Sequence, residues 1–305
     1  MVPAELLEAV NGRSLVYQPV GSMEWHGPHM GMGMDTINAH AVALEAARRT
    51  GGVVMPPLYI GTETPRSPET LGKLGFSGDE RIVGMDFPQN SVASFYWPPD
   101  LFEAIIRRQT QMLLEMGFFQ VVLLNGHGAD AQVEILERVS RELSAQSGRC
   151  VMTMMALFDG CGAGLGHAGL AETAIFAHLC PEAVELDRLP PKPQKLYNTR
   201  WGIADSETFQ KGPNEDFSVR YDPRDATPDL GAQIVEYTVN QCVRLVEQAH
   251  GGKVPAGNRR GGPGRGAAAE NFPGGYGCDD ETDYRRRSRL AGKRGDSDLS
   301  GRQAR

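Results

Sequence analysis

The chain has 305 residues, of which 40% are hydrophobic, so it is long enough for one large domain or two small ones. Its 31 Lys and Arg and 38 Asp and Glu give a net charge of −7. Residues 1–250 carry 19 basic and 31 acidic side chains (−12), whereas residues 251–305 carry 12 and 7 (+5). An acidic body repels phosphate groups, which argues against a nucleic-acid partner.

The amino terminus and the apolar runs indicate where the protein resides. No apolar run approaches the roughly 18–20 residues that cross a bilayer, so we expect no membrane partner. The start, MVPAELLEAVNGRS, is acidic where a signal peptide is basic and apolar, and a cytoplasmic location is therefore expected. The five cysteines are odd in number and form no CxxC, which argues against a disulfide framework or a structural zinc knuckle.

The first 250 residues alternate segments typical of strands and helices. We expect strands at 14–20, 52–60, 118–124 and 150–158, and helices at 36–50, 101–116, 132–146, 170–179 and 231–250. Asp35 or Thr36 is a candidate N-cap for the helix at 36–50, and residues 65–90 are rich in loop signals. This alternation predicts an α/β fold with three layers (αβα) around a mostly parallel central sheet.

Residues 251–305 differ from the rest of the chain. They begin GGKVPAGNRRGGPGRG and hold few aliphatic side chains, so they cannot bury enough surface to offset the entropy of ordering. We predict a disordered tail after a folded domain at 1–250. An Arg/Gly-rich RNA-binding segment is the alternative for this tail.

Three loops carry side chains that a hydrophobic core would not use. Residues 21–35 (GSMEWHGPHMGMGMD), 125–130 (NGHGAD) and 159–173 (DGCGAGLGHAGLAET) each follow an expected strand. In open α/β sheets ligands bind outside the carboxyl ends of the strands, so the three loops can converge on one site. Together they supply four histidines (His26, His29, His127 and His167) and three carboxylates (Glu24, Asp35 and Glu172), which makes this a candidate metal site.

The residue types of the first loop suit metal binding. Glu24 and His26 lie two apart, so in an extended segment their side chains point the same way. The carboxylate of Asp35, at the start of a helix, has two oxygens and can bridge two cations. Oxygen and nitrogen ligands without thiolate fit Zn²⁺, Mn²⁺ or Fe²⁺.

Together these motifs resemble the creatininase family. They are Glu-x-His-Gly-Pro-His at 24–29 with Asp-Thr at 35–36, Asn-Gly-His-Gly at 125–128 and His-Ala-Gly-x-x-Glu-Thr at 167–173. The resemblance implies a creatininase-like domain at 1–250 with two divalent ions, Zn²⁺ first. It implies that Glu24, Asp35 and His127 bind one ion, and that His26, Asp35 and Glu172 bind the other. It also implies that His167 is a catalytic proton donor and that the protein forms a homo-oligomer, often a hexamer in the family.

The chain departs from this family at several positions. Creatinine amidohydrolase has a metal-binding Glu where this chain has Ala129, and many members have Glu where it has Leu170. Met23 and Trp25 replace the common Thr and Gln. The ligand set is intact, so we expect hydrolysis of a small-molecule cyclic amide or formamide other than creatinine. A peptide-processing hydrolase and a non-catalytic metal-binding or assembly protein remain alternatives.

The other motifs have competing interpretations. Trp25, Tyr96 and Trp97 could line a substrate pocket, although Tyr96 and Trp97 before two prolines can equally form a packed corner. Glu172 could stabilise a helix dipole, His167 could anchor a loop, and His29 is expected to orient a ligand. Two other classes of protein stay open: a GxGxxG nucleotide site and a cysteine hydrolase. The nucleotide site would use Gly164, Gly166 and Gly169, with Glu185 or Asp187 as the ribose-binding acid. The cysteine hydrolase would use Cys161 and His167.

Overall fold

The computed structural model describes residues 1–73, 76–88, 90–158, 160–196 and 221–250. The predicted tail at 251–305 lies outside these residues. Among the helices that are described, none is both long and apolar enough to cross a bilayer.

A parallel sheet forms the middle layer. Its order is β2 (Val53–Val54), β1 (Leu15–Gly21), β4 (Gln120–Asn125), β5 (Cys150–Met155), and β3 (Leu58–Tyr59) pairs with β1 beyond β2. The single strand expected at 52–60 is wrong, because Pro56 and Pro57 have no N–H to donate and divide it into β2 and β3.

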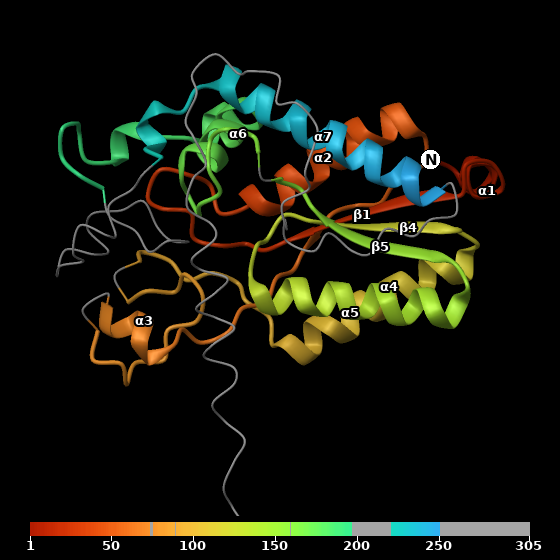
Figure 1. Cartoon of the computed structure of the whole chain (residues 1–305), viewed down its shortest axis with the longest axis horizontal. Helices are drawn as coiled ribbons and strands as arrows, with labels where there is room; N and C mark the ends of the chain where they lie inside the picture. Colours follow the sequence, from red (N-terminus) through yellow and green to blue (C-terminus); the bar gives the residue numbers. More distant parts are fainter. Residues whose placement is uncertain (74–75, 89, 159, 197–220, 251–305) are drawn as a thin grey trace, which may run out of the picture. The chain divides into compact units, whose positions relative to one another are not determined.

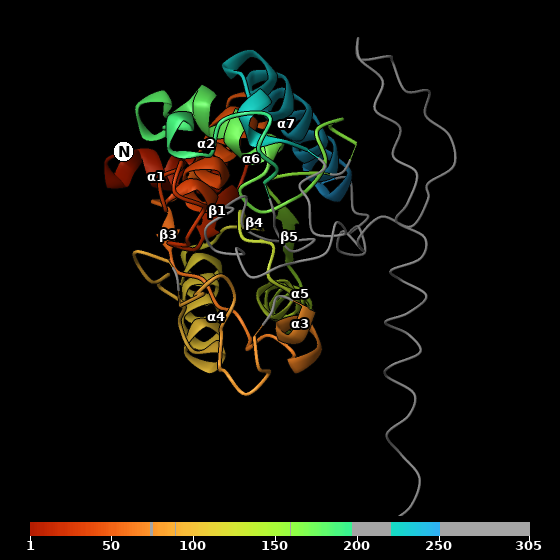
Figure 2. The same cartoon turned by 90° about the vertical axis from the view of Figure 1, so that its left-hand side faces the viewer.

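Helices cover both faces of this sheet, which confirms the three-layer αβα prediction (Figures 1 and 2). On one face lie α2 (Met34–Thr50), α6 (Leu170–Leu179) and α7 (Pro228–His250), and on the other α4 (Pro99–Met116) and α5 (Asp130–Ser147). Two short helices, α1 (Pro3–Asn11) and α3 (Pro68–Lys73), were not expected from the sequence.

Several predicted helix starts are corrected by the structure. α4 begins at Pro99 and α7 at Pro228. Proline suits the first turn of a helix, because the backbone N–H groups of that turn have no partner within the helix and the missing N–H of proline costs no hydrogen bond there. α2 begins at Met34 with Gly33 as its N-cap, so Asp35 and Thr36 are not caps. Asp35 instead lies inside the first turn, and its carboxylate is available to the site.

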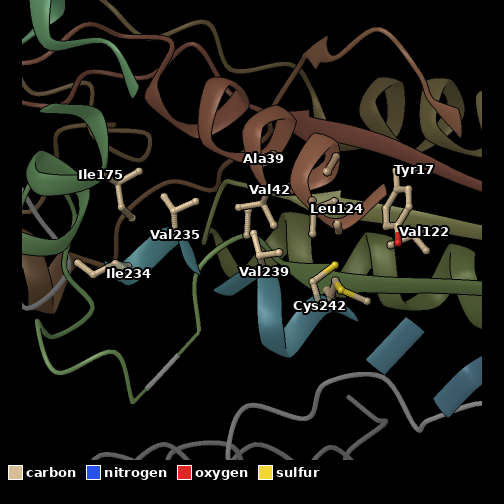
Figure 3. Packing of buried hydrophobic residues seen from close by; sticks show 14 of the residues in the cluster. Tyr17, Ala39, Val42, Val122, Leu124, Ile175, Ile234, Val235, Val239 and Cys242 are labelled. Atoms are coloured by element: carbon tan, nitrogen blue, oxygen red, sulfur yellow. The ribbon is translucent and has the colours of Figure 1, made fainter. Parts of the chain in front are cut away.

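Alternation along the strands divides the core into two parts. Leu15 and Tyr17 of β1 pack with α2, α6 and α7, while Val16 and Val20 face α4 and α5. In the first part, valines of α2 and α7 meet Leu124 of β4 (Figure 3). Both sheet faces are therefore buried, and the carboxyl ends of β1 and β4 are left to carry polar groups.

Residues 62–97, here called the arm, connect β3 to α4. Among the described residues of 65–90, the prediction of a loop-rich region is confirmed except for α3. The arm has a small hydrophobic core of its own, which takes in one residue of the first motif loop. Its members are Trp25, Leu71, Ile82, Met85 and Phe87.

Candidate metal centre

The three motif loops converge at the carboxyl ends of β1 and β4. In the described residues, three groups of side chains each place their ligand atoms within 4.8 Å of one another. The groups are Glu24, Asp35 and His127; His26, Asp35 and Glu172; and Glu24, His26 and His167. The structure thus brings together all five side chains that the sequence singled out as metal ligands, and adds His167 beside them.

The first group is centred on His127. Its Nδ1 lies 3.1 Å from Oε2 of Glu24 and 3.1 Å from Oδ2 of Asp35. Ser22 donates a hydrogen bond of 2.9 Å to the same Asp35 oxygen. All four side chains are buried, so the two carboxylates face an imidazole nitrogen away from bulk water.

The second group is centred on His26. Its Nδ1 donates to the backbone carbonyl of Glu24 at 3.0 Å, which fixes the ring with Nε2 toward the carboxylates. Nε2 lies 3.2 Å from Oδ1 of Asp35 and 3.7 Å from Oε2 of Glu172, without a well-oriented hydrogen bond to either. Asp35 therefore turns one carboxylate oxygen to each group.

Close backbone packing places Asp35 between the two strand ends. A Cβ on Gly21 would lie 2.7 Å from the backbone nitrogen of Thr36, and one on Gly126 would lie 1.9 Å from the carbonyl oxygen of Asp35. Only glycine at both positions lets the first turn of α2 enter the space beyond β1 and β4. This role of the glycines was not predicted, because it depends on contacts between distant segments.

A chain of amides holds the turn that carries His127. Asn125 accepts from the backbone N–H of His127 at 3.0 Å and donates to its carbonyl at 2.7 Å. Gln132 of α5 donates to Asn125 at 2.8 Å and accepts from the backbone N–H of Thr62 at 2.9 Å. Asn125 was visible in the sequence as part of Asn-Gly-His-Gly, but Gln132 gave no signal.

The charges in the cluster balance one another. Burial raises the pKa of Glu24, but the charges of His127 and His167 outweigh it and lower the pKa to about 2. Burial lowers the pKa of His26, but the Asp35 carboxylate outweighs it and raises the pKa to about 10. In the same way, Glu24 and Asp35 overcome burial and raise the pKa of His127 well above its usual range. Buried carboxylates here need positive charge nearby, which protons on the imidazoles or bound divalent cations can supply.

Glu172 has two contacts. Its Oε2 accepts a hydrogen bond from the backbone N–H of Ala168 at 2.6 Å, at the start of α6. The same oxygen lies 3.7 Å from His26, and burial raises the pKa of Glu172 to about 7. The bond to Ala168 supports a role of Glu172 at the start of the helix, and the contact with His26 supports a role as a metal ligand.

His167 faces the cluster through Nδ1. Its Nε2 donates to the backbone carbonyl of Trp25, and Nδ1 lies 3.6 Å from Oε2 of Glu24. Burial lowers its pKa, and with the charge of His26 the pKa is about 4. This value lies below the usual pKa of a histidine side chain, about 6.5. The imidazole is neutral at pH 7, with its lone pair on the nitrogen that faces the site.

His29 lies beside the cluster and belongs to none of the three groups. Its Nε2 lies 3.1 Å from the hydroxyl oxygen of Thr173, the residue after Glu172. Burial and the charge of His26 lower the pKa of His29 to about 3, so its ring is neutral. The contact with Thr173 is consistent with the expectation that His29 orients the neighbouring candidate ligand, Glu172.

The three aromatic residues occupy different environments. Trp25 is only 7% exposed and packs in the core of the arm, whereas Trp97 is 37% exposed. Tyr96 points inward, and its hydroxyl donates a hydrogen bond to Oε1 of Glu24. Tyr96 thus contacts a candidate ligand directly, which neither interpretation of the aromatic run predicted.

The other two motifs do not form comparable sites. The glycine-rich loop ends at Gly169, the N-cap of α6, where Glu172 places a carboxylate in the first turn. The Glu172 carboxyl group already accepts the backbone N–H of Ala168, so this helix start does not offer that N–H to the phosphates of a nucleotide. Cys161 is 3% exposed and packs in the hydrophobic core, which does not suit a nucleophile that must meet a substrate.

Comparison with known proteins identifies the family. The family model described as "Creatininase: Creatinine amidohydrolase" matches residues 1–246. The chain is 31% identical over 245 residues to the mycofactocin precursor peptide peptidase of Mycobacterium tuberculosis (strain CDC 1551 / Oshkosh), covering 75% of this chain and 82% of that protein. It is 28% identical over 204 residues to the creatinine amidohydrolase of Pseudomonas putida, covering 61% and 72%.

Solved structures agree in fold. A crystal structure of creatinine amidohydrolase (creatininase) is 22% identical, with a TM-score of 0.56, and the match covers 84% of this chain and 96% of that one. A creatininase mutant complexed with creatine gives a TM-score of 0.58 at 22% identity, covering 82% and 96%. The chain belongs to the creatininase family, and it is an amidohydrolase, a hydrolase of C–N bonds.

Proposed function

We propose that this protein uses two divalent metal ions to hydrolyse a C–N bond of a small molecule, a cyclic amide or a formamide. One observation carries the proposal: Asp35 turns one oxygen to His127 and the other to His26, at 3.1 and 3.2 Å. A carboxylate with a separate nitrogen ligand on each side is the arrangement that a bridging ligand requires.

The ligand sets follow from the two groups. Glu24, Asp35 and His127 would hold one ion, and His26, Asp35 and Glu172 the other. The oxygen and nitrogen donors favour Zn²⁺, with Mn²⁺ or Fe²⁺ as alternatives. Structures of relatives include creatininases titled "Zn-Zn type" and "Mn". When bound, such a pair of ions lowers the pKa of water and polarises a carbonyl group, which is the chemistry that amide hydrolysis needs.

His167 would move the proton. Because Nε2–H is held by the carbonyl of Trp25, only Nδ1 is available, and it faces the site. Nδ1 would accept a proton from the attacking water and pass it to the leaving nitrogen, so the imidazole ends neutral as it began. Ser22 and Asn125 would hold Asp35 and the His127 turn in place during this transfer.

A second candidate function is supported by a specific relative. The 31% identity to a mycofactocin precursor peptide peptidase favours a peptide substrate hydrolysed by the same side chains. The two substrate classes share the scissile amide and differ in size. A peptide therefore belongs in any substrate survey of this protein.

The remaining features are also part of the proposal. We place the protein in the cytoplasm and expect a homo-oligomer, with the hexamer of the resembled family as the first possibility. A purified sample would be analysed for metal and assayed with cyclic amides, formamides and peptides, before and after treatment with a chelator. Chelator-sensitive hydrolysis supports the enzyme. Two bound ions without turnover of any substrate would favour the non-catalytic alternative.

A further inference from the structure

The hydroxyl group of Tyr96 has a fixed direction. It accepts a hydrogen bond of 3.0 Å from the backbone N–H of Met85. Its single proton is therefore left to donate, and it goes to Oε1 of Glu24. The other oxygen of that carboxylate, Oε2, lies 3.1 Å from Nδ1 of His127. Glu24 thus has one oxygen held by the arm and one directed at the metal-binding group.

The backbone around this tyrosine is tied to the backbone around Glu24. Phe95 donates its N–H to the carbonyl of Met23 at 2.8 Å. Trp25 donates its N–H to the hydroxyl of Ser94 at 3.0 Å. The two bonds hold the residues on both sides of Glu24, Met23 and Trp25, to the two residues before Tyr96. The hydroxyl therefore meets the carboxylate in a defined position.

Gly84 of the arm leaves the space that Tyr96 occupies. A Cβ at Gly84 would lie 2.7 Å from both Cζ and the hydroxyl oxygen of Tyr96, and 2.8 Å from Cγ of Glu63. The φ angle of Gly84 is +54°, a region that favours glycine. Any side chain at this position would push the tyrosine away from Glu24.

From these contacts we propose that Tyr96 is a positioning residue that makes Glu24 a one-oxygen ligand of a single metal ion. The inference rests on the proposed metal-dependent function. The hydroxyl holds Oε1 toward the arm, so Oε2, which faces His127, would bind the ion shared with Asp35 and His127. The second ligand group, His26 with Asp35 and Glu172, does not include Glu24. Loss of the hydroxyl therefore affects one ion and spares the other.

The test measures Co²⁺ binding to two variants and two matched controls. Tyr96→Phe removes the hydroxyl and keeps the ring, while Gly84→Ala displaces the tyrosine by a different route. Tyr59→Phe removes a hydroxyl from a tyrosine that is 42% exposed. Gly78→Ala adds a methyl group at a glycine with φ of +90°, where the nearest atoms are 3.6 Å away.

We expect Tyr96→Phe and Gly84→Ala to weaken one of the two Co²⁺ binding steps by roughly 10- to 100-fold, as for other partners of metal ligands. The visible spectrum of the Co²⁺-loaded protein should change with them, and both controls should match wild type. Equal weakening of both steps would mean that Tyr96 only packs, and unchanged binding in both variants would overturn this inference alone. A wild-type protein that binds no Co²⁺ would overturn the proposed function itself.

Discussion

Gly126 has no side chain because the carbonyl oxygen of Asp35 lies where its Cβ would stand, at 1.9 Å. The contact joins the end of β4 to the first turn of α2. In the Asn-Gly-His-Gly motif, this glycine therefore serves Asp35 as well as the neighbouring His127. The position of the Asp35 carboxylate, proposed above to bridge the two ions, therefore depends on a glycine that lies in a different motif.

The first prediction concerns this contact. Gly126→Ala forces Asp35 to move, so we expect loss of metal affinity at both groups and destabilisation by about 1–3 kcal/mol, as for other overpacked sites. Gly128→Ala is the matched control, because a Cβ there meets nothing within 4 Å. Metal titration and thermal unfolding of both variants check the prediction. Wild-type metal affinity in Gly126→Ala would contradict it.

The second prediction concerns Asp35. Since Asp35 faces both His26 and His127, Asp35→Ala should lose both ions, whereas loss of Glu172 should weaken only one. Glu45→Ala on the same helix is the control, since Glu45 pairs with Arg48 on the surface. Metal content after dialysis measures the outcome. Two ions per chain in Asp35→Ala would refute the bridging role.

The third prediction follows from the raised pKa of His26. A histidine whose pKa rises from 6.5 to about 10 on folding stabilises the metal-free protein below pH 6.5 and loses that stabilisation as pH rises through about 10. Glu24, with a pKa lowered to about 2, contributes above its ordinary value and loses its contribution only in acid. Chelator-treated protein should therefore melt at lower temperature at pH 10 than at pH 7.

Metal-loaded protein provides the comparison for this pH series. Its ligating imidazoles are unprotonated, so the fall in melting temperature from neutral to alkaline pH should be smaller than in the chelated form. Metal affinity should rise with pH, because protons leave the imidazoles when the ions bind. An equal pH dependence with and without metal would rule out this linkage.

The fourth prediction separates two roles of His167. As the group that moves the proton, its replacement by Gln should lower kcat by roughly 10²- to 10⁴-fold and leave metal content unchanged. As a ligand within the third group, its loss should release metal as well. Parallel measurement of kcat and metal content distinguishes the two. Full activity in His167→Gln would contradict the proton-transfer role.

The sequence predicted most of the layers of this fold. Strands β4 and β5 lie within or close to the predicted ranges 118–124 and 150–158. Helix α6 was predicted at its observed bounds, Leu170–Leu179. The strand at 14–20 was predicted, whereas the division of its side chains between two core clusters was found only in the structure. The helix starts at Pro99 and Pro228 were placed too late, although proline at the first helical position is a visible signal.

The candidate site was predicted less completely than the fold. Glu24, His26, His127 and Glu172 could be found because they follow strand ends in recognisable motifs. Tyr96 was expected either to line a pocket or to form a packed corner, and its contact with Glu24 spans 72 residues of sequence. Such contacts depend on how the arm packs, which no local pattern records. The lowered pKa of His167 likewise depends on burial and on the charge of His26.

The last prediction concerns the substrate. Creatinine amidohydrolase is expected to present a metal-binding carboxylate at the position of Ala129, which here is the N-cap of α5 and 7% exposed. A methyl group at that place changes the charge and shape of the site wall, and Glu172 is left to complete the second ligand group. Sites built to hydrogen-bond one substrate reject close analogues by several orders of magnitude, because their buried polar groups are left unpaired.

We therefore expect negligible turnover of creatinine by the Zn²⁺- or Mn²⁺-loaded protein, while another cyclic amide, a formamide or a peptide is hydrolysed. Creatinine turnover with kcat/KM of roughly 10⁴ M⁻¹s⁻¹ or more would refute this expectation. Glu172→Gln tests the second half of the argument in the same assay. If that variant keeps two ions and full activity, Glu172 serves only the start of α6, through its bond to Ala168, and the second ion needs a different ligand.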